Sequence, residues 1–297
     1  MDQKKKIMDQ YVRRYPQLCL PVKNGMSKSE EYRNTALRGN IPAELPDYFK
    51  GSAEDRAFTV ETPAGRVEVI YLAEREDFER AVKCLGYKCE EIQIPPSMGA
   101  VTISGITDWS RIRKHKEEYL KSGKTDWQAE FRRFTSVSGN YKDRIVLVSK
   151  GGYSALRAEE TRYSQEEWTK ISFDIRVFHE LCHVVCRTLF PDKKNAVVDE
   201  IIADCFGILK ATGFYDTVLA EKCLGILGDQ YRPGGRLENY LVSGEDPADH
   251  VRGIKEIIKR IDEFIKETKN KEYWDKLRLL EETLFDELKM HTRPLQP

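Results

Sequence analysis

The sequence predicts an α+β fold, with a mixed or antiparallel sheet and helices in the N-terminal half and a mainly helical C-terminal half. Three observations lead to this prediction. Strand patterns are confined to the first 150 residues, the stretch RIVLVS at 144–149 is the clearest of them, and the chain has helical periodicity from about residue 165 onward. The change of pattern predicts two subdomains, residues 1–160 and 161–297.

The N-terminal half alternates between the two kinds of element. Residues 1–50 predict one short helix and then an extended segment punctuated by Pro42 and Pro46. Alternating apolar and polar residues on either side of the turn at 62–65 predict a β-hairpin. The predicted strands are 57–60, 67–72, 91–94, 100–106 and 144–149, and the predicted helices are 75–85, 108–121 and 125–134.

The C-terminal half reads as a series of helices. The predicted spans are 165–189, 195–212, 216–228, 247–268 and 272–290. Gly213 follows one helix, and Asp246-Pro247 supplies an N-cap and a proline at the first helical position of another. An apolar stripe on 247–268 fits a core or a dimer face, and the core is favoured. Its members are Ile254, Ile257, Ile258, Ile261, Phe264 and Ile265.

Composition excludes several classes of function. The 297 residues are 40% hydrophobic and 33% charged, with 49 basic and 49 acidic residues. A net charge of zero gives no electrostatic case for nucleic acid or an anionic membrane surface as partner. No apolar run has transmembrane length, residues 1–10 lack the apolar core of a signal peptide, and the seven cysteines form no CxxC pair. We therefore expect a cytoplasmic protein with reduced thiols, and the sequence predicts no particular oligomeric state.

The most informative stretch is the HExxH motif from His179 to His183. Residues four apart lie on one face of a helix, so the two imidazoles can bind one ion. Glu180 lies beside them, within reach of a metal-bound water. The apolar residues around the motif predict a largely buried helix. Two hydrogen-bonded core histidines are the alternative interpretation.

The next predicted helix offers a third ligand. Zinc in hydrolases usually has three protein ligands and one open position, and Glu200 can fold back to supply the third. Asp204 lies one turn further on the same face, where it can accept the distal N–H of a ligand histidine. Two acids on an otherwise apolar helix are costly unless a cation compensates them. A solvated helix face is the alternative, and Asp199 is a weaker candidate for the third ligand.

HExxH followed by ExxxD resembles the gluzincin branch of the zincin metallopeptidases, over residues 172–207. The resemblance implies a zincin-like fold and one Zn²⁺ ion, with His179, His183 and Glu200 as ligands. It further implies that Glu180 is the general base and acid and that Asp204 orients a ligand histidine. The metzincin pattern is not met, because Cys186 and Leu189 replace its glycine and third histidine. Peptide deformylases also carry HExxH, but no cysteine here has the setting of their ligand.

The resemblance implies hydrolysis of a peptide or protein substrate. Gluzincins use a downstream Tyr or His to stabilise the oxyanion, and Tyr240 and His250 are candidates here. Tyr231, Arg232 and Arg236 are nearby in sequence.

Zincins also bind extended substrates along an edge strand before the motif helix. The candidate is 144–149 with Gly151, Gly152 and Tyr153, by β-augmentation. An internal strand that ends in a glycine turn fits the same residues equally well.

Two other classes of function remain open. One is a catalytically inactive zincin-like binding or regulatory protein, although the intact Glu180 argues against it. The other is a metal-free helical interaction module. The metal content of the purified protein distinguishes the second class from the enzyme.

Overall fold

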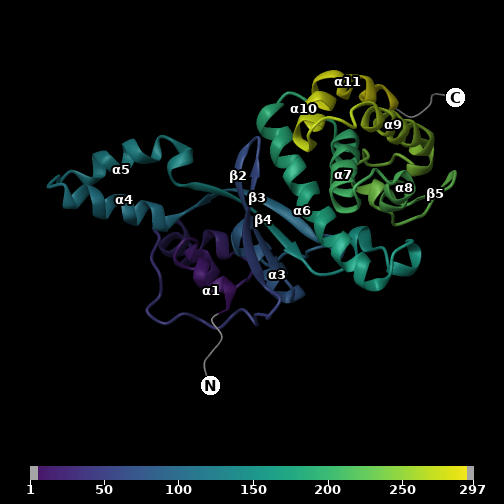
Figure 1. The fold of residues 1–297 in the computed structure, drawn as a ribbon. Helices are drawn as coiled ribbons and strands as arrows, with labels where there is room; N and C mark the ends of the chain where they lie inside the picture. Colours follow the sequence, from purple (N-terminus) through teal and green to yellow (C-terminus); the bar gives the residue numbers. More distant parts are fainter. Residues whose placement is uncertain (1–5, 293–297) are drawn as a thin grey trace. The chain divides into compact units, whose positions relative to one another are not determined.

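The computed structural model describes residues 6–292, which form two compact units (Figure 1). The first contains the chain up to residue 59 together with residues 67–150, and the second contains residues 60–66 and the chain from residue 151 onward. The predicted α+β class is confirmed, because the four-stranded sheet comes from the N-terminal half and the C-terminal half is mainly helical. The chain passes into the second unit at residue 151, ten residues before the predicted boundary. Residues 1–5 and 293–297, at the ends of the predicted subdomains, lie outside the described residues.

The sheet is mixed and has the strand order β1-β2-β4-β3. Strands β2 and β4 pair in parallel, and β3 and β4 pair antiparallel. The predicted hairpin corresponds to β1 and β2, which are neighbours in the sheet. The strand bounds are Arg56–Thr62 (β1), Gly65–Leu72 (β2), Ala100–Thr107 (β3) and Lys142–Ser149 (β4).

Strand β4 is central in this sheet, so its prediction as a substrate-binding edge strand is wrong. Val146 is paired with Val69 of β2 on one side and with Thr102 of β3 on the other. The backbone donors and acceptors of β4 are therefore engaged by its neighbours. An unbroken apolar run such as IVLV at 145–148 is typical of a strand in the middle of a sheet, and Ile145 and Leu147 are fully buried.

The α-helices of the first unit are α1 (Ile7–Tyr11), α2 (Glu30–Tyr32), α3 (Arg75–Gly86), α4 (Trp109–Lys121) and α5 (Trp127–Thr135). Of these, α3, α4 and α5 lie close to their predicted positions, whereas residues 1–50, predicted to contain one short helix, contain both α1 and α2. The strand predicted at 91–94 is wrong, because this stretch is irregular. Its apolar residue Ile94 is buried in the core of the first unit without strand pairing.

The second unit contains six α-helices and a two-stranded ribbon within the described residues. Helix α8 ends before its predicted limit because Gly225 turns the chain with a φ of 90°. The helix predicted at 272–290 is divided at Leu284. Between residues 6 and 292, no helix combines the length and apolarity needed to cross a bilayer. The bounds are α6 (Gln165–Leu189), α7 (Ala196–Thr212), α8 (Thr217–Leu224), β5 (Ile226–Leu227), β6 (Gln230–Tyr231), α9 (Pro247–Glu267), α10 (Tyr273–Thr283) and α11 (Phe285–Leu288).

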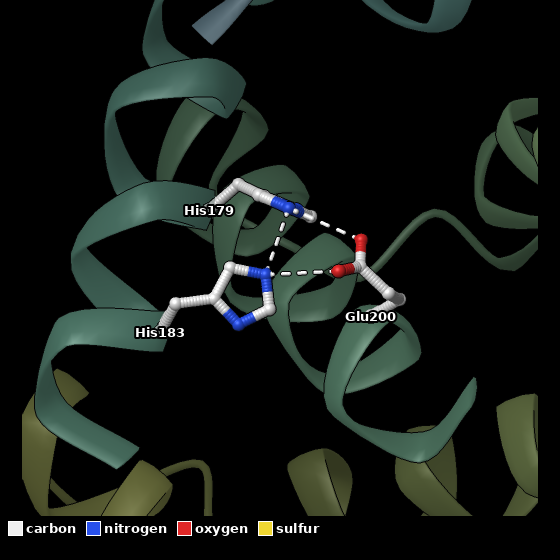
Figure 2. Close-up of side chains that lie close together, drawn as sticks. All are labelled: His179, His183 and Glu200. Atoms are coloured by element: carbon white, nitrogen blue, oxygen red, sulfur yellow. Dashed lines mark hydrogen bonds and ion pairs between the residues drawn. The ribbon is translucent and has the colours of Figure 1, made fainter. Parts of the chain in front are cut away.

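Helices α6 and α7 pack side by side and carry the sequence motif (Figure 2). A capping box starts α6, with Ser164 and Glu167 satisfying each other's backbone N–H groups. The side chain of Asn195 caps α7 by accepting from the backbone N–H of Val198 at 3.0 Å. Gly207 allows the close approach of the helices, since a Cβ there would lie 2.8 Å from the carbonyl oxygen of Ile175.

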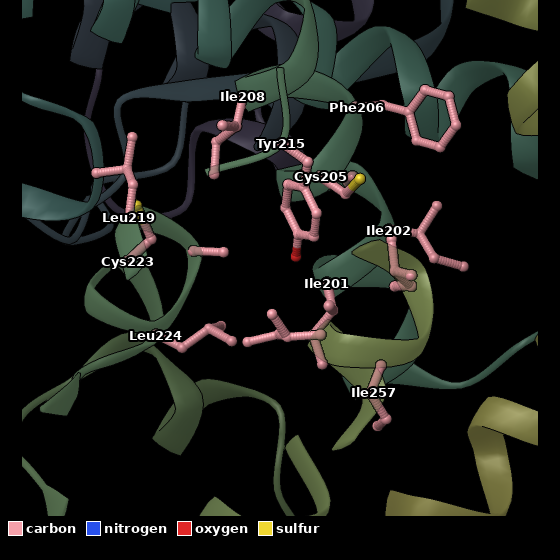
Figure 3. Packing of buried hydrophobic residues seen from close by; sticks show 14 of the residues in the cluster. Ile201, Ile202, Cys205, Phe206, Ile208, Tyr215, Leu219, Cys223, Leu224 and Ile257 are labelled. Carbon is pink, nitrogen blue, oxygen red and sulfur yellow. The ribbon is translucent and has the colours of Figure 1, made fainter. Parts of the chain in front are cut away.

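The core of the second unit surrounds α7 (Figure 3). The apolar side chains of α7 meet residues of α8 and α9 there, and Ile257 of α9 is fully buried. The stripe on α9 is therefore a core face, as predicted. Burying each such side chain contributes about 1.5–3 kcal/mol. This core packs against α7, the helix that carries Glu200.

Candidate metal centre

Three potential ligand side chains converge between α6 and α7 (Figure 2). His179 and His183 lie one turn apart on α6, and Glu200 comes from the first half of α7. One ligand atom from each lies within 4.8 Å of the others. The Nε2 atoms of the two histidines are 3.1 Å apart, and the Glu200 carboxylate oxygens lie 3.4 Å from Nε2 of His179 and 3.2 Å from Nε2 of His183. The side chains thus form a cluster that could bind a metal ion.

The cluster has about the size of a tetrahedral zinc site. With metal–ligand bonds of 2.0–2.1 Å, the edges of a tetrahedron are about 3.3–3.4 Å long. The two Nε2 atoms are 3.1 Å apart, and each lies 3.2 or 3.4 Å from a Glu200 oxygen, Oε1 for His183 and Oε2 for His179. Two imidazoles and one carboxylate are also a donor set suited to zinc. Among the described residues this is the one cluster of three such groups.

The cluster is largely buried and strongly coupled electrostatically. The side chains of His179, His183 and Glu200 are 8%, 7% and 17% exposed. Burial alone would raise the pKa of Glu200, but its hydrogen bonds with the two histidines hold that pKa well below the usual range. Burial alone would lower the pKa of His179, but hydrogen bonds with Asp204 and Glu200 raise it to about 10. Without a metal ion, a proton on the histidines compensates the negative charge of Glu200. A bound divalent cation would replace that proton.

Asp204 orients the first histidine of the cluster. Its Oδ1 atom lies 2.9 Å from Nδ1 of His179, so the contact expected from the sequence is present. This contact leaves Nε2 of His179 directed at the other ligand atoms. Burial would raise the pKa of the Asp204 carboxyl, but Arg236 and His179 together lower it.

Two further donors bind Asp204. The hydroxyl of Tyr153 donates to Oδ1 of Asp204 at 2.5 Å, and the guanidinium of Arg236 donates to Oδ2. Arg236 also donates to the Tyr153 hydroxyl at 2.5 Å. Asp204 is only 1% exposed, so these groups replace the solvent that its carboxylate has lost.

The predicted substrate-binding role of the segment Gly151-Gly152-Tyr153 is corrected, because Tyr153 is buried with its hydroxyl on Asp204 and the carbonyl groups of both glycines accept from Arg176. Arg176 donates to the carbonyl oxygens of Gly151 and Gly152 at 2.6 and 2.7 Å. A Cβ at Gly152 would lie 2.0 Å from the carbonyl oxygen of Leu156, so only glycine fits there. This tight turn follows the central strand and directs the side chain of Tyr153 towards Asp204.

Comparison with family models places the chain. One model matches residues 2–290, nearly the whole length. The chain belongs to DUF7005, a family of unknown function. No curated protein and no solved structure matches it.

In this DUF7005 protein, the position of the general base predicted from the sequence is next to the cluster. Glu180 is half-buried on α6, directly after the ligand histidine His179. Asp199, the rival third ligand, instead accepts from the backbone N–H of Asn195 at 3.3 Å. Glu200 is the acid that joins the two histidines.

The two candidates for the oxyanion donor, Tyr240 and His250, lie in different surroundings. Tyr240 is half-buried, and burial, the negative charge of Glu200 and a hydrogen bond with that carboxylate raise its pKa. The structure thus brings Tyr240 to the cluster. His250 lies at the start of α9, where its Nδ1 is 3.1 Å from the carbonyl oxygen of Thr292 and its Nε2 is 3.5 Å from Glu245. The assignment of His250 to the site is therefore corrected, because it faces the C-terminal residues of the described chain.

The sequence analysis did not predict that Arg236 and Tyr153 both donate hydrogen bonds to Asp204. The neighbouring residues have other partners, since Tyr231 donates to the Gly235 carbonyl oxygen and Arg232 donates to Glu160. Arg236 stands in the short 3₁₀ helix η7 (Arg236–Asn239), far along the chain from Asp204. No local spacing links it to the HExxH helix. The one signal was the buried Asp204 itself, which requires more donors than His179 alone.

Proposed function

We propose that this protein is a zinc-dependent hydrolase of peptide bonds. The observation that carries the proposal is the convergence of His179, His183 and Glu200, with Glu180 adjacent to the first ligand. The resemblance of HExxH and ExxxD to the gluzincins supports the same function. A site intended only for structure usually has four protein ligands and favours cysteine, whereas three such groups converge here among the described residues.

The side chains can be given distinct roles. Zinc, when bound, lowers the pKa of a water molecule towards neutrality and polarises the scissile carbonyl. The Glu180 carboxylate accepts the proton of the attacking water and passes it to the leaving amine nitrogen. The Tyr240 hydroxyl donates a hydrogen bond to the developing oxyanion. Asp204 keeps His179 in the orientation that presents Nε2.

The metal is tested on protein purified without a histidine tag. We expect elemental analysis to give one zinc per chain. Glu200→Ala should lose the metal, since it removes a ligand, while the adjacent Asp199→Ala should retain it. A wild-type protein without bound metal, or equal retention in both variants, would contradict the assignment.

The chemistry is tested with a library of internally quenched peptides with blocked ends. Glu180→Gln should keep one zinc per chain and lose roughly 10²–10⁴-fold in cleavage rate, because the amide cannot accept the proton. Glu166→Gln is the matched control, an exposed glutamate in the first turn of the same helix. Cleavage by Glu180→Gln at the wild-type rate would exclude Glu180 as the base. A wild type that binds zinc but cleaves no library peptide would favour the inactive zinc-binding protein.

A further inference from the structure

We propose that Arg236, together with Tyr153, is a positioning residue of the metal centre. Arg236 acts on the ligand histidine His179 through the carboxylate of Asp204, and the Tyr153 hydroxyl contacts both Asp204 and, at 2.9 Å, Nδ1 of His179. This inference rests on the proposed zinc site. It adds a third segment of the chain, beyond α6 and α7, on which metal binding depends. Neither Arg236 nor Tyr153 is one of the expected ligands.

Both oxygens of Asp204 are committed to donors. Oδ1 accepts from Tyr153 and lies against Nδ1 of His179, while Oδ2 accepts from Arg236. The carboxylate therefore cannot rotate about its bond without breaking at least one contact to a charged or buried donor. Its direction fixes that of the His179 ring, which in turn fixes where Nε2 points.

Arg236 is suited to this position because its guanidinium has several donors in one plane. One nitrogen binds Asp204 and another binds the hydroxyl of Tyr153. The side chain is 13% exposed, and its guanidinium carbon lies 5.0 Å from the ring centre of Tyr153 and 5.8 Å from that of Tyr240. A lysine could supply the charge, but it could not reproduce the planar, two-point contact.

The charge of Arg236 also determines how much negative charge is left to balance the metal ion. Two neutral imidazoles and the carboxylates of Glu200 and Asp204 would carry two negative charges. Arg236 pairs with Asp204, so Glu200 is the carboxylate left to balance a divalent cation. The zinc centre would then retain a net positive charge, which favours a polarised carbonyl and an ionised water.

The segment that carries Arg236 is held in place independently of the ligand helices. Tyr231 donates to the carbonyl oxygen of Gly235 at 2.7 Å. Arg232 donates to the carboxylate of Glu160 at 2.9 Å. A Cβ at Gly235 would lie 2.9 Å from the Cα atom of Gly225, so the two glycines pack backbone to backbone. Arg236 therefore acts as a fixed support for Asp204.

The test measures zinc affinity of the full-length apoprotein by competition with a chromophoric chelator. Arg236→Gln should weaken zinc binding by roughly tenfold to 100-fold, the range seen when groups that orient metal ligands are removed. Arg236→Lys should recover part of the loss, because it restores the charge but not both hydrogen bonds. Arg232→Gln is the matched control, since it removes an arginine–glutamate pair four residues away.

A double-mutant cycle distinguishes an effect through Asp204 from a general destabilisation of the site. If Arg236 acts through Asp204, then Arg236→Gln should weaken binding little further in an Asp204→Asn background. The visible spectrum of the cobalt-substituted protein should also change in Arg236→Gln and not in Arg232→Gln. Should Arg236→Gln fail to fold, Tyr153→Phe removes, with every charge intact, a hydroxyl that contacts both Asp204 and Nδ1 of His179, and it too should weaken zinc binding.

The outcomes distinguish the two proposals. Zinc binding by the wild type with unchanged affinity in Arg236→Gln and Tyr153→Phe would overturn this inference alone. Fully multiplicative losses in the cycle would do the same. Absence of zinc binding by the wild type would overturn the proposed function and this inference with it.

Discussion

At the scale of single residues, two buried acids of the second unit have opposite surroundings. Asp204 is surrounded by donors, which lower the pKa of its carboxyl. Glu281 of α10 is equally buried, at 1% exposed, but its Oε2 atom has no hydrogen-bond partner among the described residues. Burial raises the pKa of Glu281 to about 7, although a hydrogen bond with Cys186 lowers it in part. One acid is thus compensated and the other is not.

This difference predicts a pH-dependent stability. The pKa of Glu281 is about 7 in the folded protein and about 4.5 in the unfolded chain. The folded state therefore binds more protons between these values, and stability should fall as pH rises from about 4.5 to 7, by about 3 kcal/mol. Glu281→Gln cannot ionise, so its free energy of unfolding should lack this decline.

The measurement is chemical denaturation of the apoprotein at a series of pH values. Glu282→Gln is the control, because that neighbour is exposed. It should follow the wild-type pH profile. A decline of wild-type size in Glu281→Gln would show that other groups cause it.

At the scale of elements, the distance between α6 and α7 determines whether the ligands can meet. Both helices have well-defined starts at Ser164 and Asn195, and these set the rotation of each helix about its axis. Gly207 then sets their separation, since its Cα faces the backbone of Ile175. With the backbones this close, oxygens of Glu200 lie 3.4 Å from Nε2 of His179 and 3.2 Å from Nε2 of His183.

Gly207→Ala should therefore push the helices apart. The added methyl group would meet the Ile175 carbonyl oxygen at 2.8 Å, which is backbone and cannot move alone. We expect a loss of about 1–3 kcal/mol in the free energy of unfolding, together with weaker zinc binding. Gly86→Ala, at the end of α3, is the control, because its Cβ would meet only Ile103 at 3.5 Å. Equal stability of the two variants in thermal denaturation would contradict the role of Gly207.

At the scale of the whole molecule, each unit has a hydrophobic core of its own. The candidate ligands and the groups that orient them all belong to the second unit. Zinc bound to the folded state at 100 times its dissociation constant should stabilise that state by about 2.7 kcal/mol. This gain should fall on the unit that contains the site.

Hydrogen exchange measured by mass spectrometry can resolve the effect. Adding zinc should slow exchange in peptides from α6 and α7 and leave peptides from β2 and β4 nearly unchanged. The Glu200→Ala variant, treated in the same way, is the control and should show no slowing. Uniform slowing over both units would contradict a response confined to the second.

Much of this arrangement could be predicted from the sequence, because it depends on local spacing. Residues four apart on a helix place His179 with His183 and Glu200 with Asp204 on shared faces. The helix ends at Asn195 and Gly213 also follow from local capping rules. The features that escaped prediction depend on tertiary contacts. The central place of β4 and the meeting of Arg236 with Asp204 each need a partner that is distant in sequence.

The turn at Gly152 has no space for any side chain. A single methyl group there would collide with a carbonyl oxygen 2.0 Å away, and Tyr153 begins at the very next position. The phenol that reaches Asp204 therefore follows a position where only glycine leaves space for the Leu156 carbonyl oxygen. One added carbon atom, on a residue outside the His179, His183 and Glu200 cluster, would therefore displace a group that contacts His179.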